Sequence, residues 1–104
     1  MGMVELGSEV ANSLGFTKDK FFGYLWQDDK DGTITISLID SKDPGKGNLK
    51  KLFSTIEGKG YRIVVPNPMP QMEKILERWG YDKSTAYDKR FGTIDLWQKK
   101  ENAN

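Results

Sequence analysis

The chain has 104 residues, the usual length of one domain, and its 16 Lys and Arg against 15 Asp and Glu give a net charge of +1. This balance argues against a general nucleic-acid-binding or membrane-coating protein. The sequence contains no His and no Cys, which excludes disulfides, thiolate nucleophiles, zinc-finger sites and Ser–His or Cys–His catalysis. Any chemistry must therefore use carboxylates, Lys, Tyr, hydroxyl groups or backbone groups.

The sequence also carries no targeting pattern. No stretch approaches the roughly 18–20 apolar residues of a membrane span. The first residues lack the basic and then apolar pattern of a secretory signal. We therefore expect a cytoplasmic protein, in a bacterium or an infected host, with no membrane partner.

The secondary structure of the N-terminal part is indicated weakly over residues 1–20 and strongly over residues 21–39. Within residues 1–20 the pattern favours one short helix from Ser8 to Leu14, with Ser8 as its N-cap and Gly15 as its stop. The aromatic run 21–27 and the alternating run 33–39 flank an Asp-Gly turn and predict an antiparallel hairpin. The alternation places three apolar side chains on one face of the second strand: Ile34, Ile36 and Leu38.

The rest of the chain alternates between helix and strand patterns. Proline and glycine separate these segments, and Gly80 is suited to end the second helix. In chain order we expect a loop over 40–47, a helix from Asn48, a strand over 61–65, a helix over 70–79, a hairpin within 84–98 and a polar tail over 99–104.

This order predicts an α+β fold with a mixed, mostly antiparallel sheet in a single domain over residues 1–104. The strand–helix–strand unit over residues 33–65 should form a central parallel crossover of right-handed sense.

The loop between the first hairpin and the first long helix has the features of an anion-binding turn. The strand runs through Pro44, Gly45, Lys46, Gly47 and Asn48 into the helix, whose N-terminus presents free backbone amides and the positive end of the dipole. The two glycines let a ligand approach the backbone closely. Four lysines and one aspartate surround the loop: Lys42, Lys46, Lys50, Lys51 and Asp43. A phosphate or pyrophosphate is the expected ligand, and a tight turn with solvated lysines fits the glycine pattern equally well.

The glycine loop and the second long helix, in this order along the chain, resemble those of a known family. A strand, a Gly-x-Gly loop, a helix and a strand are followed by a second helix, Met72 to Tyr81 (MEKILERWGY), which ends in Gly80-Tyr81. Residues 21–98 thereby resemble the C-terminal half of the GCN5-related N-acetyltransferase (GNAT) family, in which a Gly-Phe pair commonly closes the second helix. The run Gly45 to Leu49 is most similar to small, phage-encoded members.

The resemblance implies a truncated acyl-CoA N-acyltransferase fold, because the family's first strand and first two helices are largely missing. It implies acetyl-coenzyme A as co-substrate and direct acetyl transfer to an amine of a small molecule or a protein. Backbone amides of the loop would hold the pyrophosphate, and the strand before it would pair with the pantetheine arm. The implied cofactor-binding residues are Leu38, Ile39, Gly45, Lys46, Gly47, Asn48 and Leu49.

The chain departs from the family pattern at two points. Either Gly45 or Gly47 can be aligned with the first glycine of the motif, and residues 45–49 form the binding turn in both alignments. The tyrosine that often serves as general acid falls on Leu76. Another group must then act as acid or base. The candidates are Asp40, Tyr24, Tyr81, Ser84 and Tyr87, with Tyr87 ranked first because it follows the second helix.

Three functional hypotheses follow. The first is an N-acetyltransferase, and the second is a catalytically silent GNAT-like binding or regulatory module, phage-encoded and directed at a host protein. The third is a nucleic-acid binder, suggested by interleaved aromatic residues and lysines over residues 91–100 and disfavoured by the net charge. Because a truncated sheet has an exposed edge, we also expect a homodimer.

Overall fold

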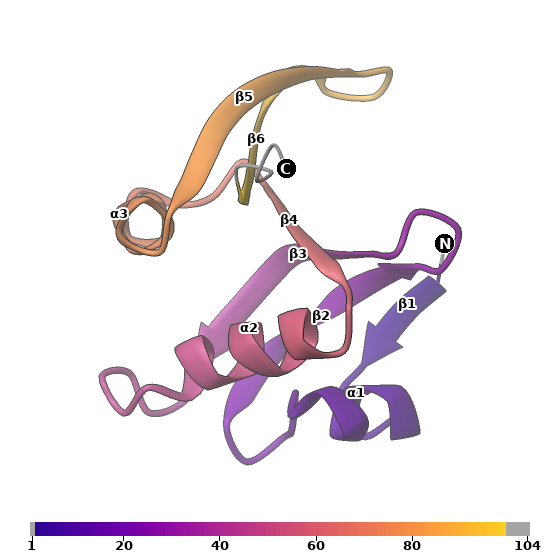
Figure 1. Cartoon of the computed structure of the whole chain (residues 1–104), viewed down its shortest axis with the longest axis vertical. Helices are drawn as coiled ribbons and strands as arrows, with labels where there is room; N and C mark the ends of the chain where they lie inside the picture. The colour runs from indigo at the N-terminus through magenta and orange to yellow at the C-terminus, as the bar shows by residue number, and fades with distance from the viewer. Residues whose placement is uncertain (1, 100–104) are drawn as a thin grey trace.

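The computed structural model describes residues 2–99, in which three helices pack against a six-stranded sheet (Figure 1). The strands pair in the order β1-β2-β3-β4-β6-β5, and only the β3–β4 pair is parallel. In chain order the elements are β1 (Gly2–Glu5), α1 (Glu9–Leu14), β2 (Phe21–Asp28), β3 (Thr33–Ser41), α2 (Asn48–Gly58), β4 (Arg62–Pro66), α3 (Pro70–Arg78), β5 (Tyr81–Asp88) and β6 (Gly92–Lys99). The α+β class, the mixed sheet and the central parallel unit are thus confirmed.

The N-terminal segment contributes to the core, and one of its elements was not predicted. The helix α1 begins after Ser8, whose side chain accepts a hydrogen bond from the Ala11 amide, and it ends at the left-handed Gly15, as expected. The strand β1 was missed because its four residues show no extended alternation, yet it pairs antiparallel with β2. Val4 and Phe16 are both buried. The segment before β2 is therefore part of the folded core.

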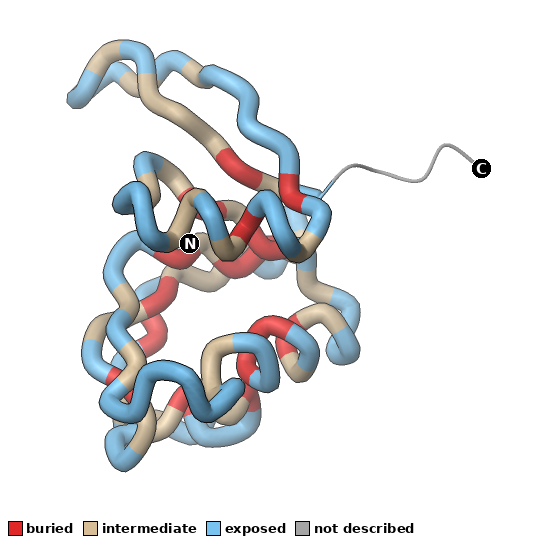
Figure 2. The backbone as a smooth tube through the Cα atoms, turned by 90° about the vertical axis from the view of Figure 1, so that its left-hand side faces the viewer, coloured by how far each residue is buried: buried red, intermediate tan, exposed pale blue. Residues whose placement is uncertain are grey.

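The core lies between the sheet and the helices. The helices α1 and α2 pack against each other, and α3 packs against β5. The buried residues, red in Figure 2, gather in this interior, whereas the turn of the β5–β6 hairpin is exposed. The buried apolar side chains are Val4, Ala11, Leu14, Phe16, Phe21, Leu25, Ile34, Ile36, Leu52, Phe53, Ile56, Ile63, Val65, Leu76, Tyr81 and Trp97.

One face assignment was wrong, and a bulge explains it. Leu25 pairs with Ile36 and the preceding Tyr24 pairs with Leu38, so Ser37 is an extra residue on β3. An extra residue interrupts the alternation of a strand and turns the following side chain to the opposite face. Ile36 is therefore buried, whereas Leu38 shares the outer face with Tyr24 and is 54% exposed.

The strand β4 changes partner along its length. Its first three residues pair with Thr33–Thr35 of β3, and its last two pair with β6. The strand was expected to end at residue 65, but β4 includes Pro66, because a proline without an amide donor is tolerated at a strand end. Asn67 then extends the contact to β6, because its amide donates to the Asp95 carbonyl and its side-chain oxygen accepts from the Asp95 amide, each at 2.9 Å.

The outer edges of the sheet are β1 and β5. The expected homodimer stays a prediction that a light-scattering mass would test. Within residues 2–99, no helix combines the length and the apolar character that crossing a membrane requires.

Candidate functional site

The loop between β3 and α2 has the geometry of an anion-binding turn. Gly45 and Gly47 adopt left-handed backbone angles, with φ of 90° and 78°. Gly47 is the N-cap of α2, and no side chain among residues 2–99 caps this helix end. The first helical hydrogen bond runs from the Lys51 amide to the Gly47 carbonyl. The amides of the first turn are therefore available to an external acceptor.

The lysines around the loop are not equivalent. The Lys42 ammonium lies 4.6 Å from the centre of the Phe22 ring, a cation–π contact that holds it toward the outer face of the sheet. Lys46 and Lys50 are exposed beside the helix N-terminus. The positive charge that faces a ligand at this turn therefore comes from Lys46 and Lys50, together with the helix dipole.

In its second half, β3 has no hydrogen-bonded strand on its β4 side within the described residues. The β3–β4 ladder ends at the pair Thr35 and Val64, and Figure 1 shows β4 rising away from β3 toward β6. Apart from the bulged Ser37, residues 36–41 are paired with β2 alone within the described chain. The Ser41 hydroxyl at the end of this segment is buried without a hydrogen-bond partner among residues 2–99. An extended ligand could pair along this edge and end at the glycine loop.

The seven predicted cofactor-binding residues fall together at this place. Leu38 and Ile39 lie in the free half of β3, and residues 45–49 form the loop and the first turn of α2. The Leu38 side chain lies on the outer face, so the contribution expected of Leu38 and Ile39 is that of their backbone groups.

The candidate acid Tyr87 lies elsewhere. It is in β5, 77% exposed, paired with Thr93 close to the β5–β6 turn. In Figure 1 this turn is on the opposite side of the molecule from the β3–α2 loop. The structure does not bring Tyr87 to the loop, and its catalytic role stays a prediction.

The other acid and base candidates are also dispersed. Ser84 lies in β5, where its hydroxyl donates to the Leu96 carbonyl at 3.3 Å. Asp40 is exposed on β3. Tyr24 is placed beside Leu38 by the β2–β3 ladder, so it is the candidate tyrosine adjacent to the free half of β3.

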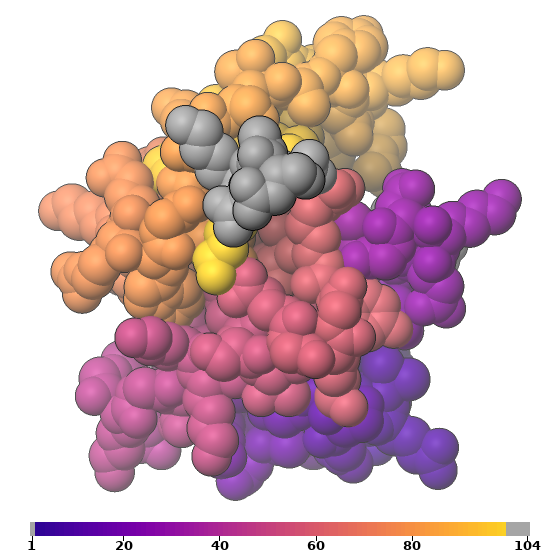
Figure 3. Space-filling view, viewed as in Figure 1, coloured from indigo at the N-terminus to yellow at the C-terminus, as the bar shows by residue number. Residues whose placement is uncertain are grey.

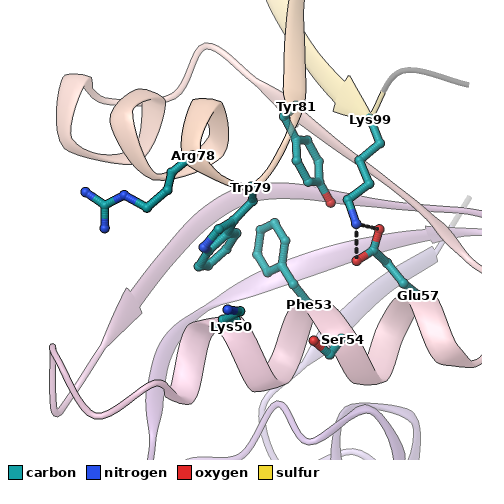
Figure 4. A pocket seen from close by; sticks show the side chains of 8 residues that line it. All are labelled: Lys50, Phe53, Ser54, Glu57, Arg78, Trp79, Tyr81 and Lys99. Carbon is teal, nitrogen blue, oxygen red and sulfur yellow. Dashed lines mark hydrogen bonds and ion pairs between the residues drawn. The ribbon is translucent and has the colours of Figure 1, made fainter.

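A pocket that sequence reasoning missed lies between α2 and the junction of α3 with β5 (Figure 4). It encloses about 270 Å³. Figure 3 shows the end of β6, in yellow, seated between α2 and the α3 region on this face. The lining residues are Lys50, Phe53, Ser54, Glu57, Arg78, Trp79, Tyr81 and Lys99.

The candidate Tyr81 lines this pocket. Burial, and secondarily the negative charge of Glu57, raise the pKa of the Tyr81 hydroxyl well above its ordinary value near 10. The hydroxyl is buried and has no hydrogen-bond partner among residues 2–99. A sequence signal for the pocket existed, because Lys50, Phe53, Ser54 and Glu57 follow the spacing of one helix face.

Comparison of the chain with protein-family models, curated proteins and solved structures gives no match in any of the three.

Proposed function

We propose that the chain is an acetyl-coenzyme-A-dependent N-acetyltransferase of the GNAT type. The observation that carries the proposal is the uncapped N-terminus of α2, flanked by Gly45 and Gly47, at the end of the half-free strand β3. These two features together suit a ligand with an anionic head and an extended, amide-bearing arm. Acetyl-coenzyme A has this chemistry in its pyrophosphate and its pantetheine.

The first-turn amides of α2 would bind the pyrophosphate, with Lys46 and Lys50 supplying compensating charge. A substituent on Gly45 or Gly47 would meet no atom within 4 Å, so the space beside both glycines is open to a ligand. Those backbone groups of Leu38 and Ile39 that face away from β2 would pair with the amides of the arm. Such pairing fixes the position of the thioester along β3.

Acetyl transfer needs groups that move two protons. Coenzyme A supplies the thioester, whose carbonyl carbon forms a bond to the amine nitrogen as its bond to sulfur breaks. A backbone amide of β3 would polarise the carbonyl oxygen. A base accepts the proton of the amine, and an acid protonates the departing sulfur. Tyr24 beside Leu38 and Asp40 on β3 are the candidates nearest the free edge.

A second function, a catalytically silent binding module, has its own supporting observation. Leu76 stands where the resembled family often has its general-acid tyrosine, and this side chain is fully buried in the core. The chain would then bind the coenzyme or a host protein without transferring the acetyl group.

Calorimetry with acetyl-coenzyme A tests the shared part of both functions. Gly47→Glu places a carboxylate at the N-terminus of α2 and should abolish binding. The matched control is Gly58→Glu at the other end of the same helix, where a side chain also meets no neighbour within 4 Å, and it should retain binding. Failure of the unchanged chain to bind at millimolar acetyl-coenzyme A would exclude the cofactor assignment.

Mass spectrometry of acetylated products separates the two functions. Incubation with acetyl-coenzyme A and a mixture of amines and proteins should give acetylated amine if the chain is an enzyme. Tyr24→Phe should then lower the rate and leave coenzyme binding unchanged. Coenzyme binding with no acetylated product favours the silent module.

A further inference from the structure

The pocket between α2 and the α3–β5 junction is distinct from the glycine loop and has a composition of its own. One wall is a helix face of α2, and the facing wall comes from the end of α3, the start of β5 and the end of β6 (Figure 4). Its volume of about 270 Å³ is just below the usual range for small-molecule sites and suits a ligand of one ring.

Three aromatic rings form the apolar part of the pocket. Phe53 contacts Trp79 with ring centres 5.1 Å apart and Tyr81 with ring centres 5.9 Å apart, both edge to face. Phe53 and Tyr81 are buried, whereas Trp79 is partly exposed. A planar ring can therefore pack against Trp79 without displacing a core side chain.

The Tyr81 side chain leaves one polar atom unsatisfied in this wall. Tyr81 is only 4% exposed, and its hydroxyl has no partner among residues 2–99. In Figure 4 the hydroxyl points toward the side chains of Glu57 and Lys99. A buried hydroxyl without a hydrogen bond is unfavourable, because it has lost its hydrogen bonds to water without replacement. A ligand atom that accepts from it would recover that free energy.

The ion pair that covers this hydroxyl opens at small cost. The Lys99 ammonium lies 3.0 and 3.2 Å from the two Glu57 carboxylate oxygens, and the side chains are 48% and 31% exposed. Ion pairs between side chains this exposed contribute little to stability. Displacement of the Lys99 side chain would therefore give a ligand access to the Tyr81 hydroxyl.

The charges of the pocket favour an anion. Three cations, Lys50, Arg78 and Lys99, line it against the single carboxylate of Glu57, which is already paired with Lys99. Lys50 and Arg78 are exposed and make no ion pair within the described residues. In Figure 4 the exposed Arg78 side chain extends away from the aromatic rings, so it would turn toward Trp79 to meet a ligand. Its planar guanidinium then matches a carboxylate in a two-point contact.

We infer that this pocket binds a small aromatic carboxylate: one ring packed against Trp79, its carboxylate at Arg78, and a hydrogen-bond acceptor at the Tyr81 hydroxyl. This site is independent of the coenzyme assignment, because it uses neither the loop amides nor the free edge of β3.

The test uses 4-hydroxybenzoate as probe, with benzoate as the analogue that lacks the acceptor. Calorimetry with the full chain should show saturable binding. Arg78→Gln should weaken both ligands about 10-fold or more, because a charge-assisted hydrogen bond is lost. Lys74→Gln, an exposed change on the same helix outside the pocket, should leave both affinities unchanged.

Tyr81→Phe provides a readout that a merely structural role would not give. It should weaken 4-hydroxybenzoate roughly 3- to 10-fold and leave benzoate unchanged, because it removes one hydrogen bond and no packing. Gly47→Glu should leave probe binding intact. The inference is overturned by absence of binding at millimolar probe, by equal losses in Arg78→Gln and Lys74→Gln, or by competition between the probe and coenzyme A.

Discussion

The replacement Gly23→Ala tests whether the close approach of the Leu38 carbonyl on β3 requires glycine at position 23 of β2. Gly23 has φ +113° and pairs with Ile39, next to the extra residue Ser37. An added Cβ would lie 2.1 Å from the Leu38 carbonyl oxygen and 2.8 Å from its carbonyl carbon. These are backbone atoms, so the contact can be relieved only by moving β3 relative to β2.

Two costs add at this position. A side chain at this φ costs about 1–3 kcal/mol of backbone strain. Displacing packed neighbours adds typically about 1–3 kcal/mol. Gly45→Ala is the matched control, because Gly45 has a similar φ of +90° but nothing within 4 Å of its added Cβ. Gly45→Ala should therefore lower the free energy of unfolding only by the cost of backbone strain.

Urea and thermal unfolding, followed by circular dichroism, measure the difference between the two variants. Gly23→Ala should lose about 1–3 kcal/mol more free energy of unfolding than Gly45→Ala. That difference corresponds to a melting temperature lower by roughly 4–8 °C for each kcal/mol. Equal losses in the two variants would refute the argument that close approach of Leu38 requires glycine at position 23.

Two further predictions concern the cap of α1 and the buried tyrosine. Ser8→Ala removes the acceptor of the Ala11 amide and should lower the free energy of unfolding by about 1 kcal/mol, measured by urea denaturation, with an unchanged value contradicting the capping role. Because the pKa of Tyr81 is raised on folding, the folded chain keeps this proton above pH 10, where the unfolded chain loses it. The unchanged chain should therefore lose stability relative to Tyr81→Phe as pH rises above 10, by up to about 1.4 kcal/mol per pH unit, whereas parallel pH profiles would contradict the shift.

The elements with strong local signals could be predicted from the sequence. Periodicity located α2 and α3, and residue-specific signals located their boundaries, such as the left-handed Gly80 after α3. The antiparallel hairpin 21–39 followed from alternation and an Asp-Gly turn. In each case the determinant lies within a few residues of the structure it dictates.

The features that were missed depend on contacts between distant segments. The bulge at Ser37 arises from how β2 and β3 fit together, so the exposure of Leu38 could not follow from alternation alone. The strand β1 is defined by its pairing with β2 rather than by its own four residues. The pocket joins one face of α2 to residues 78–99, and helix spacing marks only the α2 wall, because the opposite wall is brought to it by tertiary packing.

The change of partner along β4 also has a mechanical consequence. Within residues 2–99, β4 is the only strand hydrogen-bonded both to β3 and to β6. The sheet therefore consists of two parts, β1-β2-β3 and β6-β5, joined by the five-residue strand β4. On the helix side, Phe53 of α2 connects the two parts through its contacts with Trp79 and Tyr81. The Glu57–Lys99 ion pair also joins α2 to β6, so a movement of one part relative to the other would have to bend β4 and disturb both this ion pair and the packing around Phe53.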